Sequence, residues 1–475
     1  MSNQNTLYTG DNLYILNGLD SESFDLIYLD PPFNKNRNFS APVGSQAAGN
    51  SFKDMWTWED VDKSYLNELV DNYPNLVRFI ESIEIMHSKP MKSYVTYMTL
   101  RIIELHRVLK KSGAFYLHCD PTASHYLKLV CDRIFNKNNF RNEIIWKRVS
   151  GAGKSSQHKA KKWGASSDTI LFYSKSKSSS VMPFRDFRDD EIIKKFNKVD
   201  ENGERYYDDS NHIFRAKGYG DRPNLCYEWR GFENPNPSGW TLSKKRLEEE
   251  YQKGNFVILE NGKRLQRRKY LKDHKGYALN NIWDDIPTPS KKERTGYPTQ
   301  KPLKLLKRII SSSSKEGDRI LDPFCGCATA CVAAEDLGRN WVGIDISPTS
   351  AQLVANRIHN DAGLFTDFNH IDCSNGKNYP IRSGITKIKK QDAKEILYKK
   401  QKGICAGCKV HFLIQNFTVD HVIPKSKGGP DALSNYQLLC GNCNSIKGNR
   451  PMAYLQMKID KNKELMKLKN SFGSN

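Results

Sequence analysis

The segment from Arg319 to Asp345 constrains the fold of this 475-residue chain more than any other. The short apolar run 319–321 leads into a turn of small residues, 322–329, and the apolar run 341–344 ends about twenty residues later in the carboxylate Asp345. Small residues in a turn after a strand let backbone amides approach a ligand, and nucleotide-binding folds place an acid at this distance to bind ribose hydroxyls. The segment therefore predicts a nucleotide-binding α/β sheet, although it lacks the glycine pattern of a dinucleotide site.

A second buried strand is predicted at 24–29, and it ends in Asp30-Pro31-Pro32-Phe33. A carboxylate and a proline carbonyl at the mouth of a strand are two acceptors for one amino group, and Phe33 adds a flat face beside them. A Pro-Pro pair alone fits a plain turn equally well. With the acid and the aromatic ring, the run indicates a site for the exocyclic amine of a base.

The charge of the chain narrows the choice of partner. A formal net charge of +21, spread along the sequence, favours a polyanion, and nucleic acid is the first candidate. A basic protein without such a partner is the alternative. No apolar run approaches the roughly 20 residues that a membrane span needs, and Met1–Asn5 has no apolar signal core, so we expect a cytoplasmic protein that does not enter membranes.

The eleven cysteines are distributed unevenly. An odd number without a secretion signal argues against a disulfide framework. Only the last four have paired spacing, Cys405 with Cys408 and Cys440 with Cys443. Two Cys-x-x-Cys pairs predict a structural zinc site, because four thiolates complete a tetrahedron around the ion.

Two of these runs resemble motifs of one enzyme family. Asp30-Pro31-Pro32-Phe33 is similar to the catalytic motif of DNA amino-methyltransferases of the adenine type, and 322–329 resembles their S-adenosylmethionine motif, with Cys327 and Ala328 in place of the usual Ser and second Gly. The catalytic motif comes first in the chain, which is the order of the beta class, and the resemblance spans roughly residues 7 to 360. Either order assembles the same cleft, since both motifs follow strands at a switch point of the sheet.

The resemblance implies a Rossmann-like S-adenosylmethionine-dependent methyltransferase sheet with an inserted target-recognition region. It implies catalytic roles for Asp30, Pro31, Pro32 and Phe33, and cofactor contacts for Asp11, Lys301, Asp322, Phe324, Gly326 and Asp345. Methylation of a cytosine amine is the nearest alternative, and that type usually has Ser in place of Asp30. Attack by a cysteine on a ring carbon is excluded by the absence of a Pro-Cys dipeptide. His118 and Cys119, in a predicted strand, form a weaker candidate for a nucleophile pair.

The sequence between the two cysteine pairs resembles the His-Asn-His (HNH) endonuclease family, whose ββα-metal fold clasps one ion. The matching positions are Val419 to Pro424, Gly428-Gly429, Asn435 and Asn444-x-x-Lys447. The resemblance implies that His421 is the general base and that Asn435 orients its imidazole. It also implies that Asp420 and Asn444 hold Mg²⁺ or Mn²⁺ and that Lys447 contacts a phosphate. A zinc ribbon that binds DNA without cutting is the alternative.

These inferences predict a DNA methyltransferase fused to a metal-dependent endonuclease, of the restriction and modification type. We expect double-stranded DNA as the partner and a homodimer at least on DNA, because one nuclease centre cuts one strand. The basic loop at Gly151–Ser156 is expected to touch the DNA backbone. The predicted organisation is a catalytic half, a target-recognition region, a cofactor half, a linker and an HNH domain, at 1–180, 181–295, 296–361, 362–400 and 401–475.

Overall fold

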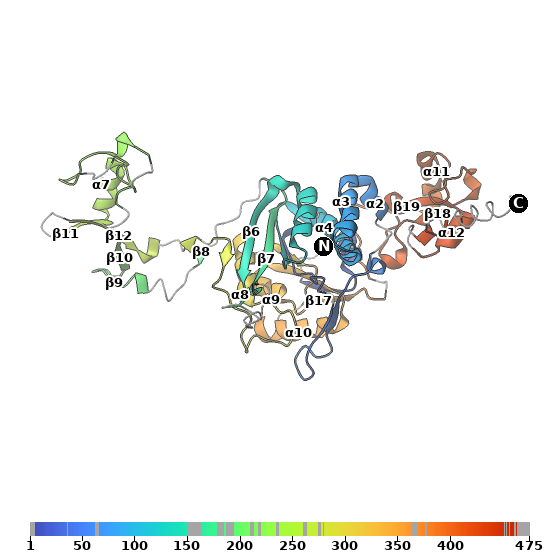
Figure 1. Ribbon diagram of the computed structural model, residues 1–475, viewed down its shortest axis with the longest axis horizontal. Coiled ribbons are helices and arrows are strands. Elements are labelled where there is room, and N and C mark those ends of the chain that lie inside the picture. The colour runs from blue at the N-terminus through green and yellow to red at the C-terminus, as the bar shows by residue number, and fades with distance from the viewer. Residues whose placement is uncertain are drawn as a thin grey trace. The chain divides into compact units, whose positions relative to one another are not determined.

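The computed structural model describes most of the chain. The described residues are 5–35, 37–61, 66–149, 163–177, 185–186, 194–209, 213–216, 220–233, 237–259, 264–273, 277–278, 280–362, 368–375, 378–450, 452, 454–455, 457–459 and 462. The predicted basic loop at Gly151–Ser156 lies outside them. The chain divides into two compact units, Met1–Met182 with Asn280–Asn475, and Pro183–Leu279 (Figure 1).

A nine-stranded sheet forms the centre of the first unit within the described residues. In sheet order its strands are β14 (Ile282–Trp283), β6 (Phe140–Lys147), β7 (Ser167–Ser174), β5 (Leu109–Cys119), β2 (Phe24–Leu29), β15 (Arg319–Asp322), β16 (Asn340–Asp345), β1 (Thr6–Thr9) and β17 (Asn369–Asp372). Strand β7 is antiparallel to its neighbours, and the other pairings are parallel. The carboxyl ends of the parallel strands therefore share one edge.

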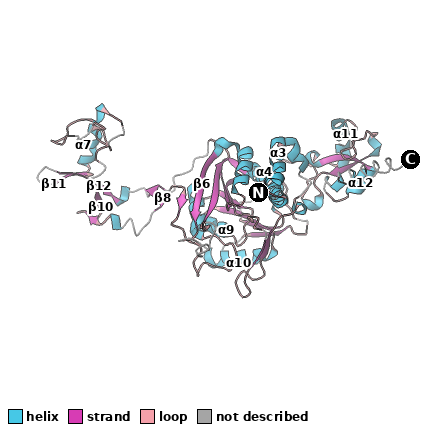
Figure 2. Cartoon of the chain, in the orientation of Figure 1, coloured by secondary structure: helices cyan, strands magenta, loops and turns pink. Residues whose placement is uncertain are grey.

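Helices cover both faces of this sheet (Figure 2). One face carries α1 (Asn12–Gly18), α2 (Leu66–Asn72), α3 (Pro74–Met86), α4 (Lys89–Val108) and α5 (Ser124–Cys131), and the other carries α8 (Leu303–Ser313), α9 (Thr329–Asp336) and α10 (Pro348–Ala362). Strand β2 shows why two cores form. Its alternate residues Ile27 and Leu29 pack in the first core, and Leu26 and Tyr28 pack in the second. A strand buried on both faces reads as a continuous apolar run.

Helix α8 illustrates how the sequence pattern becomes packing. Leu305, Leu306, Ile309 and Ile310 recur at helical spacing, and all four side chains are completely buried against the sheet. Each buried side chain of this size contributes roughly 2–3 kcal/mol through the hydrophobic effect. The helix begins directly after Pro302, so its packing also fixes the position of Lys301.

The second unit is small and has its own core. It contains α7 (Lys244–Gln252) and a four-stranded sheet of β11 (Phe256–Leu259), β12 (Arg264–Tyr270), β10 (Arg205–Asp209) and β9 (Lys198–Val199). Trp229, Trp240 and Phe256 are buried at its centre. A two-stranded pair, β8 (Arg185–Asp186) with β13 (Tyr277–Ala278), joins its two chain ends. The unit ends at Leu279, before the predicted boundary at 295, because β14 already pairs with β6.

The carboxyl-terminal module is a short hairpin flanked by helices. Strands β18 (Phe417–His421) and β19 (Tyr436–Cys440) are antiparallel, and α12 (Gly441–Lys447) follows directly. Helix α11 (Lys390–Gln401) packs Ala393 and Leu397 into the same core as Leu438. This arrangement is the ββα order that the HNH resemblance implied.

The predicted α/β class is confirmed, and so are the strands predicted at 24–29, 319–321 and 341–344. The linker predicted at 362–400 is wrong, because its beginning contains β17, a strand of the main sheet, and its end contains α11. The sequence pattern did not predict α11, because the helix buries only two side chains and carries several lysines.

A short hairpin of β3 (Arg37–Ser40) and β4 (Ser51–Asp54) follows the Asp-Pro-Pro-Phe run. None of the helices in the described ranges is both long and apolar enough to cross a bilayer.

Candidate functional site

A cavity of about 700 Å³ opens at the carboxyl edge of the main sheet. Asp30, Asp322 and Asp345 follow or end the adjacent strands β2, β15 and β16, so the fold gathers them at this edge. All the residues that the methyltransferase resemblance singled out line this cavity: Asp11, Asp30, Pro31, Pro32, Phe33, Lys301, Asp322, Phe324, Gly326 and Asp345.

Asp30 has two unlike carboxylate oxygens. Its Oδ2 accepts a short hydrogen bond from the ammonium of Lys301, whose side chain is 9% exposed. Its Oδ1 is buried and has no hydrogen-bond partner among the described residues. A buried acceptor without a partner is costly, so this oxygen is poised to accept a hydrogen bond from a ligand.

The turn after β15 has the backbone shape of a ligand cradle. Gly326 has a φ of +52°, and a Cβ added there would lie 3.0 Å from the ring of Tyr297. Ala328 has a φ of +55°, a left-handed conformation that normally favours glycine. The buried Arg357 supports the turn through the carbonyl of Cys327, at 2.5 Å. The turn therefore keeps its shape despite Ala328.

Asp345 is already tied to this turn. Its Oδ2 accepts from the Gly326 amide at 2.9 Å, and its Oδ1 accepts from the Ser347 amide at 2.8 Å and the Ser350 hydroxyl at 3.0 Å. Burial raises the pKa of Asp345, and these donors only partly offset that effect. Burial also raises the pKa of Asp322 well above its usual value, and the charges of Asp30 and Asp345 add to the shift. The side of the cavity formed by the ends of β15 and β16 is thus rich in buried carboxyl groups.

Asp11 belongs to a buried polar network that the sequence did not reveal. It caps α1 by accepting from the Leu13 amide at 2.9 Å and pairs with Arg101 at 2.7 Å. Arg101, 2% exposed, also donates to Asn12, whose amide donates to the Pro323 carbonyl. Helix α4 is therefore linked through α1 to the turn after β15. The sequence signal for this buried network is Arg101, an arginine that lies among the apolar positions of a helix.

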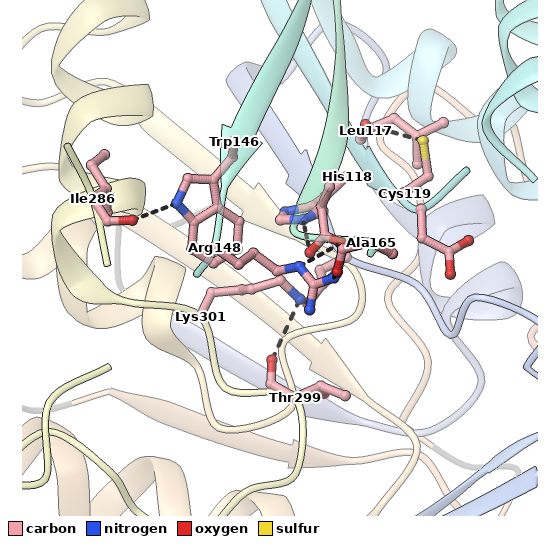
Figure 3. A network of polar contacts seen from close by, with 12 residues as sticks. Leu117, His118, Cys119, Trp146, Arg148, Ala165, Ile286, Thr299 and Lys301 are labelled. Atoms are coloured by element: carbon pink, nitrogen blue, oxygen red, sulfur yellow. Dashed lines mark hydrogen bonds and ion pairs between the residues drawn. The ribbon is translucent and has the colours of Figure 1, made fainter. Parts of the chain in front are cut away.

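Trp146 of β6, Arg148 and Asp168 of β7 line another part of the cavity. Figure 3 shows Trp146 and Arg148 with His118 of β5 near them. His118 is fully buried: Nε2 lies 3.2 Å from Asp168, and Nδ1 lies 2.9 Å from the Tyr28 hydroxyl. Arg148 pairs with the other oxygen of Asp168 at 2.9 Å. Burial opposes ionisation of Asp168, but His118, Lys301 and Arg148 together lower its pKa. The ring of His118 stacks on Phe33 at a centroid distance of 6.0 Å.

This geometry excludes His118 and Cys119 as a nucleophile pair. Both nitrogens of the imidazole are engaged with Tyr28 and Asp168. Cys119 is fully buried, and burial raises the pKa of its thiol well above the usual value. Arg148 and Asp168 are cavity residues that the sequence analysis missed, because neither lies in a recognisable motif.

The carboxyl-terminal module places His421 at the end of β18. Its Nε2 lies 2.8 Å from Asp431, which also accepts from the Tyr436 hydroxyl at 3.0 Å and pairs with Lys425 at 2.6 Å. Burial lowers the pKa of His421, although Asp431 opposes the shift. Burial opposes ionisation of Asp431 itself, but its hydrogen bonds with Lys425 and His421 lower the pKa of that carboxyl to about 2. The sequence analysis did not single out Asp431.

Asn435 shapes the loop beside the imidazole. Its side chain accepts from the Ile423 amide at 2.8 Å and donates to the carbonyls of Ile423 and Pro430. The imidazole contact belongs to Asp431. Among the described residues, Asn435 therefore contacts the backbone at Ile423, close to His421, and at Pro430, next to Asp431, rather than the imidazole itself.

Asp420 and Lys447 form a buried pair. Lys447, 1% exposed, donates to Asp420 at 2.9 Å and to the His421 carbonyl at 3.0 Å, and Gln437 donates to the same oxygen of Asp420. The phosphate contact expected for Lys447 is wrong, because its ammonium is buried in these contacts. Asn444 is half-buried and lies within helix α12.

The sulfur atoms of Cys405, Cys408, Cys440 and Cys443 all lie within 4.8 Å of one another. Four thiolates at about 2.3 Å from a tetrahedral Zn²⁺ stand roughly 3.8 Å apart, so the group fits such an ion. Burial opposes ionisation of Cys405, but amide donors of Cys440, Cys408 and Gly407 lower its pKa overall. This is the four-cysteine site that the spacing predicted.

Comparison with known proteins agrees with this geometry. Residues 24–356 match the DNA methylase family of N6 and N4 amino-methyltransferases. The chain belongs to this family. Residues 405–450 match the HNH endonuclease family, so the protein is a DNA methylase with an HNH domain.

Among its relatives is the type II methyltransferase M.EcaI of Enterobacter cloacae, 26% identical over 74% of this chain and 69% of that protein. Another is the DNA adenine methyltransferase YhdJ of Escherichia coli K12, 25% identical over 72% of this chain and 78% of that protein. The solved structure of the PvuII DNA methyltransferase, which is cytosine-N4-specific, aligns with 78% of this chain and 95% of its own at 14% identity and a TM-score of 0.38.

Proposed function

We propose that the methylase transfers a methyl group from S-adenosylmethionine to the exocyclic amine of adenine in double-stranded DNA, and that its HNH domain cuts DNA. The observation that carries the first part is the Oδ1 atom of Asp30, a buried acceptor without a partner among the described residues, in a residue that lines the cavity.

The cofactor side of the cavity suits S-adenosylmethionine, which supplies an electrophilic sulfonium methyl group when bound. Gly326 lines the cavity in the turn after β15, and Asp345 stands at the ribose position implied by the resemblance. Phe324, Asp322 and Asp11 complete that side. The buried carboxyl groups favour a cationic ligand.

The target amine would enter from the other side after the base is flipped out of the duplex. One N–H would donate to Asp30 Oδ1 and the other to the Pro31 carbonyl, so the nitrogen lone pair points away from both acceptors. Phe33 would stack on the base. Asp30 Oδ1 is also placed to take the proton that the methylated amine releases. Adenine is favoured over cytosine because the motif begins with Asp and a relative is named as an adenine methyltransferase.

Analysis of the DNA product tests this proposal. DNA treated with protein and labelled cofactor is digested to nucleosides, and we expect N6-methyladenine. N4-methylcytosine would replace the adenine assignment, and a product without a methylated amine would refute the reaction. We also expect Asp30→Ala to reduce methyl transfer at least about 1000-fold while the cofactor dissociation constant, measured by calorimetry, changes less than threefold. Asp284→Ala, at an exposed acid, is the matched control.

In the nuclease, His421 would act as the general base and Asp431 would hold its ring. Asp420 and Asn444 offer the oxygen ligands that Mg²⁺ or Mn²⁺ prefers. The four cysteines would hold a structural Zn²⁺. Removal of the exchangeable ion should stop cleavage and leave methylation intact.

We further propose that the two activities form a restriction and modification pair. M.EcaI is named as a type II methyltransferase, and a Salmonella typhimurium relative is named as a type III restriction-modification Mod subunit. The unit Pro183–Leu279 has room for sequence recognition that the small HNH module lacks. A methyl group at a recognised amine typically costs about 1–3 kcal/mol, so modification would weaken binding before cleavage. A double-strand break needs two nuclease centres, so we expect a homodimer on DNA.

A plasmid challenge tests the pairing. His421→Ala protein first methylates a plasmid fully, and intact protein then meets this plasmid and an unmethylated copy. We expect only the unmethylated copy to be cut. Equal cutting would refute self-protection, and cutting of the methylated copy alone would make the enzyme methylation-dependent.

A further inference from the structure

Lys301 was expected to contact the cofactor, but its ammonium lies on Asp30. The two residues are 271 positions apart in the chain, and the pair is largely buried, with side-chain exposures of 9% for Lys301 and 16% for Asp30. The ammonium also lies 5.4 Å from the ring centre of Phe33. Figure 3 shows the Lys301 side chain extending toward the group around Arg148 and His118.

This contact makes the two oxygens of Asp30 unequal. A free carboxylate can rotate and present either oxygen, whereas an ammonium fixed on Oδ2 leaves Oδ1 as the oxygen without a partner among the described residues. We propose that Lys301 is a positioning residue for methyl transfer, which anchors Oδ2 of Asp30 and so aims Oδ1 at the target amine. The inference rests on the proposed amine methylation.

Charge argues against the cofactor role for Lys301. The sulfonium of S-adenosylmethionine is a cation, and a second cation nearby would weaken its binding. Lys301 instead compensates the acids of the cavity, because it lowers the pKa of Asp168 and limits the rise in the pKa of Asp322. Without the ammonium, Asp30 would lose its only direct ionic partner among the described residues.

The backbone that carries Lys301 is held firmly. The Gln300 side chain accepts from the Thr295 amide at 2.8 Å and donates to the Glu293 carbonyl at 2.7 Å. Glu293 in turn accepts from the Leu303 amide at 2.5 Å, at the start of α8. A long lysine side chain on such a fixed segment can serve as a precise anchor, because little conformational freedom remains to be lost.

The experiment compares Lys301→Met, which keeps the length without the charge, with Lys301→Arg, which keeps the charge. Lys304→Met is the control, since Lys304 is an exposed lysine on the same segment, 59% exposed. We expect Lys301→Met to lower the kcat of methylation about 100-fold, because small misplacements of reacting groups cost rates of this order. The cofactor dissociation constant and the melting temperature should stay close to those of the control. Lys301→Arg should recover at least a tenth of wild-type kcat.

A double-mutant cycle separates positioning from other roles. On an Asp30→Asn background, Lys301→Met should cause less than a threefold further loss, because its effect passes through the carboxylate. Additive losses would overturn the proposal. So would weaker cofactor binding at unchanged kcat, which would return Lys301 to the cofactor. Failure of the wild-type protein to methylate an amine would instead refute the proposed function itself.

Discussion

The methylase cavity and the nuclease module assemble their polar groups in opposite ways. The cavity joins residues from distant parts of the chain, such as Asp30 and Lys301, at the edge of a sheet with an apolar core on each face. The nuclease site comes from one hairpin and one helix, and its core is small. A large sheet can hold buried charges in place by packing alone. A module of this size has too little apolar burial for that, so we expect thiolates around a metal to supply the missing stability.

The largest expected effect tests this difference directly. Cys443→Ser should unfold the nuclease module and reduce cleavage at least about 1000-fold, because a structural zinc site contributes most of the folding energy of such a module. Methyl transfer should stay within twofold. Zinc content by mass spectrometry and both activities would be measured, with Cys226→Ser, at an exposed cysteine, as the control. A parallel loss of methylation would show that the two regions fold as one.

Asp345→Ala tests whether packing can replace a lost contact on the cofactor side. The variant loses the acceptor for Gly326, Ser347 and Ser350 as well as the proposed ribose contact. Charge-assisted hydrogen bonds contribute roughly 2 kcal/mol, so cofactor affinity should fall about 30-fold in calorimetry. The kcat at saturating cofactor should change less than threefold. A large loss of kcat at unchanged affinity would contradict the assignment.

The pair of Asp285 with Arg308 tests the role of charge in the methylase unit. Two hydrogen bonds from Arg308, at 2.9 and 2.5 Å, lower the pKa of Asp285 to about 2. A depressed folded pKa stabilises the protein above the ordinary value near 4, and this contribution is lost as the pH falls from about 4 to about 2. For a partly exposed pair we expect about 1 kcal/mol.

Asp285→Asn should remove this part of the acid sensitivity. The measurement is denaturant unfolding of the methylase unit at pH 6 and pH 3, followed by tryptophan fluorescence. Asp284→Asn, at the exposed neighbouring acid, should leave the pH dependence as it is in the wild type. An unchanged slope in Asp285→Asn would mean that the pair contributes nothing measurable.

The smallest effect concerns Ala328 in the cofactor turn. Glycine would relieve about 1–2 kcal/mol of left-handed strain, but it would lose about 0.8 kcal/mol of methyl burial and add chain entropy to the unfolded state. Ala328→Gly should therefore change the free energy of unfolding by less than about 0.5 kcal/mol. Ala330→Gly, in the buried helix α9, should cost about 1–2 kcal/mol. Equal costs at both positions would show that Ala328 carries no strain.

The sequence by itself determined the parts of this protein that are local in the chain. Three motifs can be interpreted from residue type and spacing alone: the Asp-Pro-Pro-Phe run, the turn before α9 and the paired cysteines. The pattern of apolar residues also indicated strands such as β2. It failed for α11, where two buried positions among lysines are too weak a pattern.

Only the tertiary structure decided which charges meet. The pairing of Lys301 with Asp30, of Arg148 with Asp168 and of Asp431 with His421 follows from how strands and loops are placed side by side. Buried charges must find partners, but many acids and bases in a chain could serve, and sequence spacing does not rank them. The choice depends on distances of a few ångströms, which the packing of the core around each pair sets.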